Sequence, residues 1–224
     1  MMKEDLKIFF EFCPCPIIAI TGTKGKSTTA SLIREMLKLS GKNVYLSGLN
    51  GECDFEFLDR LKPQSVVVLE LSSSQLQDMQ KPPHIAVMLG IAGEHLDDGD
   101  LPAGRQGLER VDAMRNMLRF QGGSDFAILN RDYPATNESD IFTEGKVFYV
   151  SREREVDEGC FVRDGKVVLR GVVGDEERIV IDAKKILLKG KDNLENVCAA
   201  VMASVLAGAS MKGIRKVLVS FRLD

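Results

Sequence analysis

The sequence predicts an α/β fold: a mostly parallel sheet flanked by helices, with a small antiparallel β subsheet at about 142–186. Three observations support this class. Candidate strands and helices alternate over roughly the first 140 residues, as in sheets built from strand–helix–strand units. The run 65–71 (SVVVLEL) is continuous and rich in β-branched residues, as expected of a central parallel strand covered on both faces. Later segments are short and separated by turns, and 163–166 (RDGK) is a strong hairpin signal.

Apolar runs and turn residues place the individual elements along the chain. We expect strands at 17–20, 44–46, 65–71, 84–89 and 126–129, and helices at 27–40 and 107–120. The first helix should bury Ala30, Ile33, Met36 and Leu37. Short strands are expected at 146–150, 160–163, 166–170 and 178–182, and further helices at 193–207 and 211–218. Asp192 is the expected N-cap of helix 193–207, and Gly208 is its expected stop. The polar stretch 97–107 indicates a surface loop.

Composition limits the class of protein. The chain has 224 residues, of which 44% are hydrophobic, as is ordinary for a soluble globular protein. A net charge of −3 implies no general affinity for nucleic acid or for an anionic membrane. The sequence shows neither an apolar run of about 18 residues nor a signal-peptide layout. The five cysteines have irregular spacing, typical of reduced thiols. We therefore expect a cytoplasmic protein, which we take to be a monomer.

The most informative motif is 21–29 (TGTKGKSTT), which follows a buried apolar run and opens a helix. Glycines allow backbone N–H groups to approach phosphate oxygens, and a helix N-terminus adds partial positive charge. Lys26 would reach the β- and γ-phosphates, while Ser27 or Thr28 would offer a hydroxyl to Mg²⁺. The candidate phosphate-binding residues are Gly22, Thr23, Lys24, Gly25, Lys26, Ser27 and Thr28. The motif is shorter than the usual one, because Ile20 stands where its first glycine is expected. It predicts a P-loop NTPase-like sheet; the alternative is a simple turn capped by Ser27.

Three further positions fall where ligands bind in open α/β sheets. Glu70 ends the central strand beside the phosphate loop, a suitable place for a Mg²⁺ ligand, although a solvent-facing strand end is the alternative. His95 lies between acids in 93–97 (GEHLD), where it is either a ligand or a structural histidine. Asn193 and Asn196 share one face of a helix. Their amides could read an adenine edge, or could only cap the helix and contact the surface.

Taken together, four segments resemble the central ATP-binding domain of the Mur ligase family. They are TGTKGKSTT, LELSSSQL, GEHLD and LKGKDNLENVCAA, in the family's order and spacing over about residues 15–218. LELSSSQL is similar to the segment of the family branch that adds D-glutamate. The resemblance implies an ATP-dependent amide ligase of peptidoglycan precursor synthesis. Such a ligase activates the carboxylate of UDP-MurNAc-L-alanine as an acyl phosphate, which the amine of D-glutamate then attacks.

The same resemblance implies roles for individual residues. With ATP and Mg²⁺ as cofactors, Lys26 would bind phosphates, and Ser27 and Glu70 would hold the first Mg²⁺. His95 would help to form a second metal site, and Asn193 and Asn196 would contact adenine. Lys26, Glu70 and His95 are thus the expected catalytic group.

The chain departs from the family pattern at several positions. Met114 stands where the family has a lysine that is carbamylated in the working enzyme, and a thioether cannot form a carbamate. Asp192 replaces a histidine, Ser74 replaces a phenylalanine and Glu94 replaces an aspartate.

The resemblance also implies a domain organisation. Residues 1–218 would form the central domain and 219–224 would begin a linker to a C-terminal domain. That domain and an N-terminal UDP-binding domain would lie outside this chain. We therefore expect the isolated chain to bind Mg-ATP without ligating. Two alternatives are a non-catalytic ATP-binding remnant and a ligase resembling folylpolyglutamate synthase.

Overall fold

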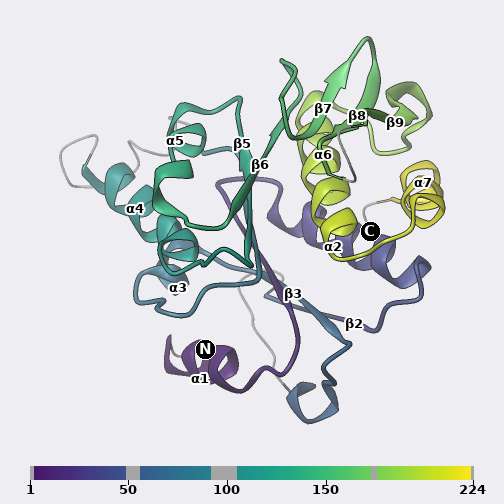
Figure 1. Cartoon of the computed structure of the whole chain (residues 1–224). Coiled ribbons are helices and arrows are strands. Elements are labelled where there is room, and N and C mark those ends of the chain that lie inside the picture. Colours follow the sequence, from purple (N-terminus) through teal and green to yellow (C-terminus); the bar gives the residue numbers. More distant parts are fainter. Residues whose placement is uncertain (1–2, 49–55, 92–104, 173–175, 223–224) are drawn as a thin grey trace.

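A nine-stranded sheet runs through the middle of the protein, with helices on both of its faces (Figure 1). The computed structural model describes residues 3–48, 56–91, 105–172 and 176–222. The strands are β1 Ile17–Thr21, β2 Val44–Ser47, β3 Val66–Glu70, β4 Ile85–Met88, β5 Phe126–Asn130, β6 Lys146–Ser151, β7 Gly159–Arg163, β8 Lys166–Arg170 and β9 Arg178–Asp182. Their spatial order is β2-β3-β1-β4-β5-β6-β7-β8-β9. The α/β class with a mostly parallel sheet is confirmed.

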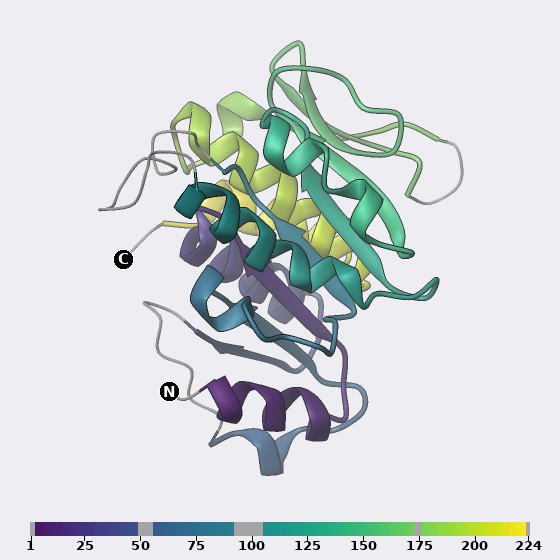
Figure 2. The ribbon, with the colours of Figure 1, turned by 90° about the vertical axis from the view of Figure 1, so that its left-hand side faces the viewer.

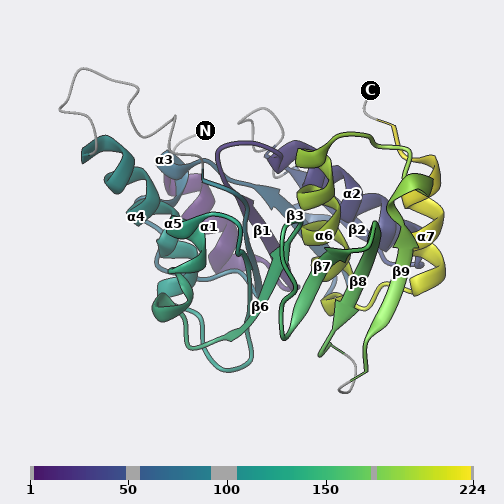
Figure 3. The same cartoon turned by 90° about the horizontal axis from the view of Figure 1, so that it is seen from above.

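The helices are α1 Lys3–Phe12, α2 Lys26–Leu39, α3 Ser73–Leu76, α4 Arg105–Arg119, α5 Pro134–Asn137, α6 Lys191–Leu206 and α7 Met211–Ser220. Short 3₁₀ turns lie at Leu58–Arg60, Asp140–Phe142 and Ala183–Lys185. Viewed from above, α2, α6 and α7 cover one face of the sheet, and α1, α3, α4 and α5 cover the other (Figure 3). Figure 2 shows the second layer of helices from its own side.

The two apolar cores follow from this three-layer arrangement. On β3, Val66 and Val68 face the core beneath α2 and α6, while Val67 and Leu69 face the core beneath α1 and α4. All four are at most 6% exposed, because successive strand residues point to opposite faces and both faces are covered. On α2, the predicted apolar face is confirmed, since Ala30, Ile33, Met36 and Leu37 are all fully buried.

The antiparallel part is confirmed but is narrower than predicted. Among the described strands only β7, β8 and β9 pair in antiparallel fashion, and β6 is parallel to both of its neighbours. These strands continue the main sheet, because a strand's sequence does not reveal its pairing partner. The hairpin prediction at 163–166 is confirmed, with positive φ angles at Asp164 (50°) and Gly165 (70°).

Three details of the helices differ from the prediction. Asp192 is not an N-cap: Gly190 occupies that position with φ 111°, and Asp192 lies in the first turn, where its Oδ1 accepts from Arg152 Nη1 at 2.9 Å. The predicted stop at Gly208 is confirmed by its φ of 82°. Most of the predicted loop 97–107 lies outside the described residues, and 105–107 begin α4. Helices α1, α3 and α5 were not expected.

The strand order places the candidate phosphate loop, the glycine-rich turn of the 21–29 motif (hereafter the phosphate loop), at a topological switch point. In the sheet, β3 and then β2 lie on one side of β1, and β4 lies on its other side. The chain thus builds first on one side of β1 and afterwards on the other. In open α/β sheets, ligands bind outside the carboxyl ends of the strands where this reversal occurs. The loop that follows Thr21 therefore lies between the ends of β3 and β4.

Candidate functional site

The phosphate loop needs glycine at two positions. Gly22 has φ +145°, and a Cβ added there would lie 2.7 Å from Leu89 Cβ. Gly25 is the N-cap of α2 with φ +84°, and a Cβ added there would lie 2.1 Å from Asn196 Oδ1. Both φ angles lie in the region that side-chain-bearing residues rarely adopt. The backbone can therefore pack closely against β4 and α6 only because these residues have no side chain.

Two threonines fix the loop to the neighbouring strands. Thr23 donates to Gly90 O through its backbone N–H at 3.2 Å and through Oγ1 at 3.0 Å. Thr21 Oγ1 donates to Leu71 O at 2.9 Å. The loop is thus bonded to the chain just past β4 and just past β3. Its position is set by the sheet before any ligand arrives.

The N-terminus of α2 is suited to an anion. Among the described residues no side chain caps it, and its first turn contains no acid. The first N–H groups of a helix and its dipole favour negative charge at such an end. Lys26 folds back over the loop, where its Nζ donates to Gly22 O at 3.0 Å. Lys24 is exposed, and Thr28 is half-buried in the first turn.

The structure brings Ser27 and Glu70 together. Ser27 Oγ donates to Glu70 Oε2 at 2.6 Å, and Glu70 is only 7% exposed. A hydroxyl and a carboxylate are hard oxygen ligands, the type that Mg²⁺ prefers. In the described part of the chain no cluster of three or more His, Cys, Asp or Glu side chains could hold a metal. This donor pair fits Mg²⁺, which commonly takes its remaining ligands from water and phosphate.

The two asparagines of α6 lie beside the loop in different ways. Asn196 is 7% exposed and lies against Gly25, and its Nδ2 donates to Asn193 Oδ1 at 3.3 Å. Asn193 Nδ2 donates in turn to Lys189 O at 2.7 Å. The pair therefore links the start of α6 to the phosphate loop.

A buried carboxylate behind these asparagines was missed by the sequence reasoning. Glu195 accepts from Asn130 Nδ2 at 3.1 Å and from Tyr133 OH at 3.3 Å, and pairs with Arg152 Nη1 at 2.9 Å. Burial raises the pKa of Glu195, an effect that the positive charge of Arg152 opposes. The network joins the N-terminal part of α6 to the chain at the ends of β5 and β6. Its only sequence signal is an acid at the start of a largely apolar helix.

Two further positions from the sequence analysis are His95 and Met114. His95 lies outside the described residues, as does the rest of GEHLD. Met114 is on α4, 5% exposed, and belongs to the core between α4 and the sheet.

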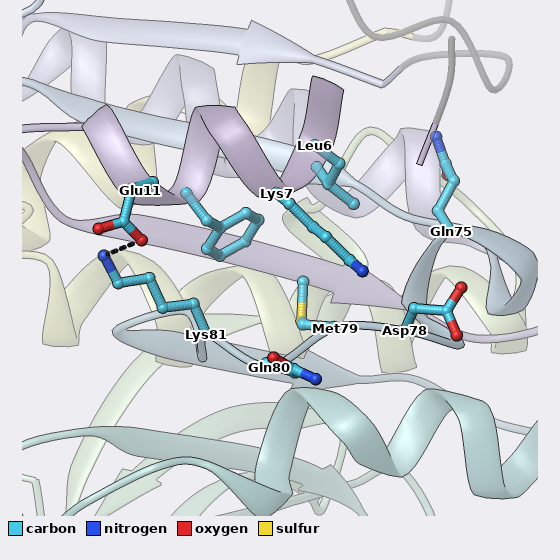
Figure 4. Close-up of a pocket in the computed structure, with 9 residues that line it drawn as sticks. Leu6, Lys7, Glu11, Gln75, Asp78, Met79, Gln80 and Lys81 are labelled. Carbon is cyan, nitrogen blue, oxygen red and sulfur yellow. Dashed lines mark ion pairs between the residues drawn. The ribbon is translucent and has the colours of Figure 1, made fainter. Parts of the chain in front are cut away.

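A separate cavity of about 310 Å³ opens between α1 and residues 75–81 (Figure 4). Phe10 and Met79 provide apolar surface, and Lys81 Nζ pairs with Glu11 Oε2 at 3.0 Å across it. None of the residues of the phosphate loop lines this cavity.

None of the described helices has the length and apolarity needed to cross a membrane.

Comparison with known proteins identifies the family. The model of the Mur ligase middle domain matches residues 20–204. The UDP-N-acetylmuramoylalanine--D-glutamate ligase of Acetivibrio thermocellus is 36% identical over 220 residues, covering 98% of this chain and 46% of that protein. The enzyme of the same name from Symbiobacterium thermophilum is 35% identical over 222 residues, covering 98% of this chain and 47% of that protein. The chain thus spans about half the length of these curated relatives.

Solved structures share the fold. A UDP-N-acetylmuramoyl-L-alanyl-D-glutamate--2,6-diaminopimelate ligase superposes with a TM-score of 0.68 at 22% identity, covering 97% of this chain and 48% of that one. MurF from Acinetobacter baumannii superposes with a TM-score of 0.68 at 17% identity, covering 98% and 49%. The middle-domain match spans most of the sequence. It includes both the phosphate loop, which begins after Thr21, and the two asparagines of α6. This chain belongs to the Mur ligase family.

Proposed function

We propose that residues 1–218 are the ATP-binding central domain of a ligase that joins D-glutamate to UDP-MurNAc-L-alanine in peptidoglycan precursor synthesis. The observation that carries the proposal is the 2.6 Å contact between Ser27 Oγ and Glu70 Oε2 at the mouth of the glycine loop. The names of the curated relatives support D-glutamate as the acceptor. In this proposal residues 219–224 begin a linker. The domains that bind UDP and the amino acid belong to the other half of a protein of the relatives' length.

The chemistry assigned to this chain is charge neutralisation and positioning. When bound, Mg-ATP supplies the phosphoryl group that activates a carboxylate for amide formation. Lys26 and the N-terminus of α2 hold the phosphates and balance their negative charge. Ser27 and Glu70 hold Mg²⁺, and His95 contributes to a second metal position. Asn196, with Asn193 behind it, contacts the adenine side of the nucleotide.

Met114 favours a second candidate, a module that binds ATP without catalysing ligation. Its thioether cannot form the carbamate of the family's lysine, and the side chain packs in an apolar core with 5% of its surface exposed. The two candidates agree on Mg-ATP binding. They differ in whether a lysine at this position, together with the remaining domains, restores ligation.

A chimera separates the two candidates. Residues 1–222 replace the matching half of the Acetivibrio thermocellus relative, with either Met114 or Met114→Lys. Phosphate release is measured with Mg-ATP, UDP-MurNAc-L-alanine and D-glutamate. We expect Met114→Lys to raise turnover well above that of the Met114 chimera, and turnover to occur only with D-glutamate among amino acids that include L-lysine and meso-diaminopimelate. The matched control is Met114→Lys combined with Lys26→Ala, which should be inactive.

Two results would contradict the ligase proposal. A folded Met114→Lys chimera that binds Mg-ATP but never ligates would favour the non-catalytic module. Protection of the chain against heat by a folate, without protection by UDP-MurNAc-L-alanine in the chimera, would favour the folylpolyglutamate synthase-like alternative.

A further inference from the structure

Two thiols lie in contact where α1 ends and β1 begins, on the segment that enters the sheet ahead of the phosphate loop. Cys13 Sγ and Cys15 Sγ are 3.7 Å apart, and Cys13 Sγ also lies 3.4 Å from Cys15 O, to which it donates. Cys13 is half-buried, whereas Cys15 is 8% exposed. Neither residue contacts the phosphate loop in any hydrogen bond of the described structure. The proposed ligase chemistry therefore leaves this pair unused.

The local backbone holds the two sulfurs together. Pro14 separates the cysteines and Pro16 follows them, and each ring fixes its own φ near −65°. The N–H of Cys13 donates to Phe9 O at 2.9 Å, which ties the segment to α1. The N–H of Val67 donates to Pro16 O at 3.0 Å, which ties it to β3. The thiols are thus preorganised, so little conformational freedom is lost when they react with each other.

The two thiols have different reactivity. The hydrogen bond from the Cys15 thiol lowers the pKa of Cys13 to about 7. The same hydrogen bond and burial raise the pKa of Cys15, which stays protonated. An accessible thiolate beside a buried, protonated thiol is the arrangement that favours attack on an external disulfide followed by internal closure. No metal-binding cluster of three or more His, Cys, Asp or Glu side chains exists among the residues the structure describes, so redox chemistry suits the pair better than metal binding.

We propose that Cys13 and Cys15 form a reversible dithiol–disulfide site that reacts with low-molecular-weight disulfides of the oxidised-glutathione class. The Cys13 thiolate attacks one sulfur, the S–S bond of the small disulfide breaks, and one thiolate leaves and takes up the proton that Cys13 had released. The Cys15 sulfur then attacks Cys13 Sγ and expels the second thiolate, which takes up the Cys15 proton. Two electrons pass from the pair to the small disulfide, which becomes two thiols.

The chain contains its own control for this reaction. Cys160 on β7 and Cys198 on α6 are a second pair of thiols, and both are fully buried. Burial raises the pKa of Cys160 well above its ordinary range. Because neither thiol is accessible to a small disulfide in solution, this pair should stay reduced. Cys53 lies outside the described residues, so it is replaced by serine in every sample.

The test equilibrates the Cys53→Ser chain with reduced and oxidised glutathione, then alkylates free thiols in denaturant and digests with trypsin. Cleavage after Lys7 and Lys24 leaves both cysteines in one fragment, 8–24. We expect this fragment to be about 2 Da lighter than its reduced form, because the disulfide forms with loss of two hydrogens, and to carry no alkyl group. The fragments that carry Cys160 and Cys198 should be alkylated in full.

Single variants test the division of labour. Cys15→Ala should retain one glutathione on Cys13, and Cys13→Ala should leave Cys15 unmodified. With its pKa lowered to about 7, Cys13 has a larger thiolate fraction near pH 7 than an ordinary thiol has. Lower intrinsic nucleophilicity offsets part of this gain, so alkylation of Cys13 in the native protein should be a few-fold faster than for a free cysteine.

The proposal is overturned if fragment 8–24 is alkylated at both cysteines in a buffer that fully oxidises a thioredoxin-type dithiol. It is also overturned if Cys13→Ala and Cys15→Ala take up glutathione equally. The first measurement uses no variant of the pair, so it decides the question even if a substitution prevents folding.

Discussion

Replacing Gly25 by alanine tests the geometry of the phosphate loop, and Gly41→Ala is its matched control. Both glycines have nearly the same backbone conformation, with φ +84° at Gly25 and φ +80° at Gly41. They flank the same helix, α2. They differ in their surroundings: a Cβ at Gly25 would lie 2.1 Å from Asn196 Oδ1, whereas one at Gly41 would meet nothing within 4 Å.

The structure gives the expected size of each effect. A left-handed conformation costs a residue with a side chain about 1–2 kcal/mol, so Gly41→Ala should lower the free energy of unfolding by that amount. Gly25→Ala incurs the same cost and must also displace Asn196, which is 7% exposed. A buried polar group that loses its partners costs about 1–3 kcal/mol more. The expected total at Gly25 is about 2–5 kcal/mol.

Urea denaturation and calorimetric titration with Mg-ATP measure the two consequences. Gly25→Ala should weaken Mg-ATP binding at least about tenfold, because the methyl group and the displaced Asn196 occupy the approach to the loop. Gly41→Ala should leave the affinity within about twofold of the wild type. Equal losses of stability in the two variants, together with unchanged Mg-ATP affinity in Gly25→Ala, would refute the reasoning.

Three further predictions follow from the same contacts. Ser27→Ala should weaken Mg-ATP binding about tenfold while changing the affinity for metal-free ATP little, as measured by titration with and without Mg²⁺. Met117→Ala, in the core beneath α4, should lower the free energy of unfolding by about 2–5 kcal/mol, whereas Leu108→Ala, on the same helix with a side chain 70% exposed, should change it by less than about 0.5 kcal/mol. Hydrogen bonds from Arg163 and Arg170 lower the pKa of Glu177 in the folded protein. Its stabilising effect is therefore present above the unfolded-state pKa of about 4.3, and it is lost as pH falls through the lower folded-state pKa. Between about pH 5 and 3, the free energy of unfolding of Glu177→Gln should fall less steeply with decreasing pH than that of the wild type. An equal fall in both proteins would contradict this.

Local sequence signals were enough to predict the glycine-rich loop after Thr21 and the helix that follows it. Glycine spacing, the apolar run before the loop and the period of α2 are all properties of neighbouring residues, and the structure agrees with each of them. The class of the sheet was also predictable, since covered parallel strands such as β3 have continuous apolar runs. Helix α1 could have been predicted too, because Leu6, Phe9 and Phe10 form one buried face at helical spacing.

Long-range pairing could not be predicted in the same way. The sequence of β6 does not show that both of its neighbours are parallel, because strand pairing depends on where distant segments are placed. The partners of Glu195 lie 43 to 65 residues away, at Asn130, Tyr133 and Arg152. The error at Asp192 was local: the capping preference of aspartate lost to Gly190, whose positive φ starts the helix two residues earlier.

The measurement that tests the central claim most directly is calorimetric titration of the chain with Mg-ATP, beside Lys26→Ala and Lys38→Ala. Both lysines are on α2, but Lys26 lies at the phosphate loop and Lys38 is exposed at the opposite end. A hydrogen bond to a charged group contributes about 1.5–3 kcal/mol, so Lys26→Ala should weaken saturable binding about 10- to 100-fold while Lys38→Ala binds as the wild type does. A folded wild-type chain that shows no saturable binding, or equal affinities in all three proteins, would contradict the account.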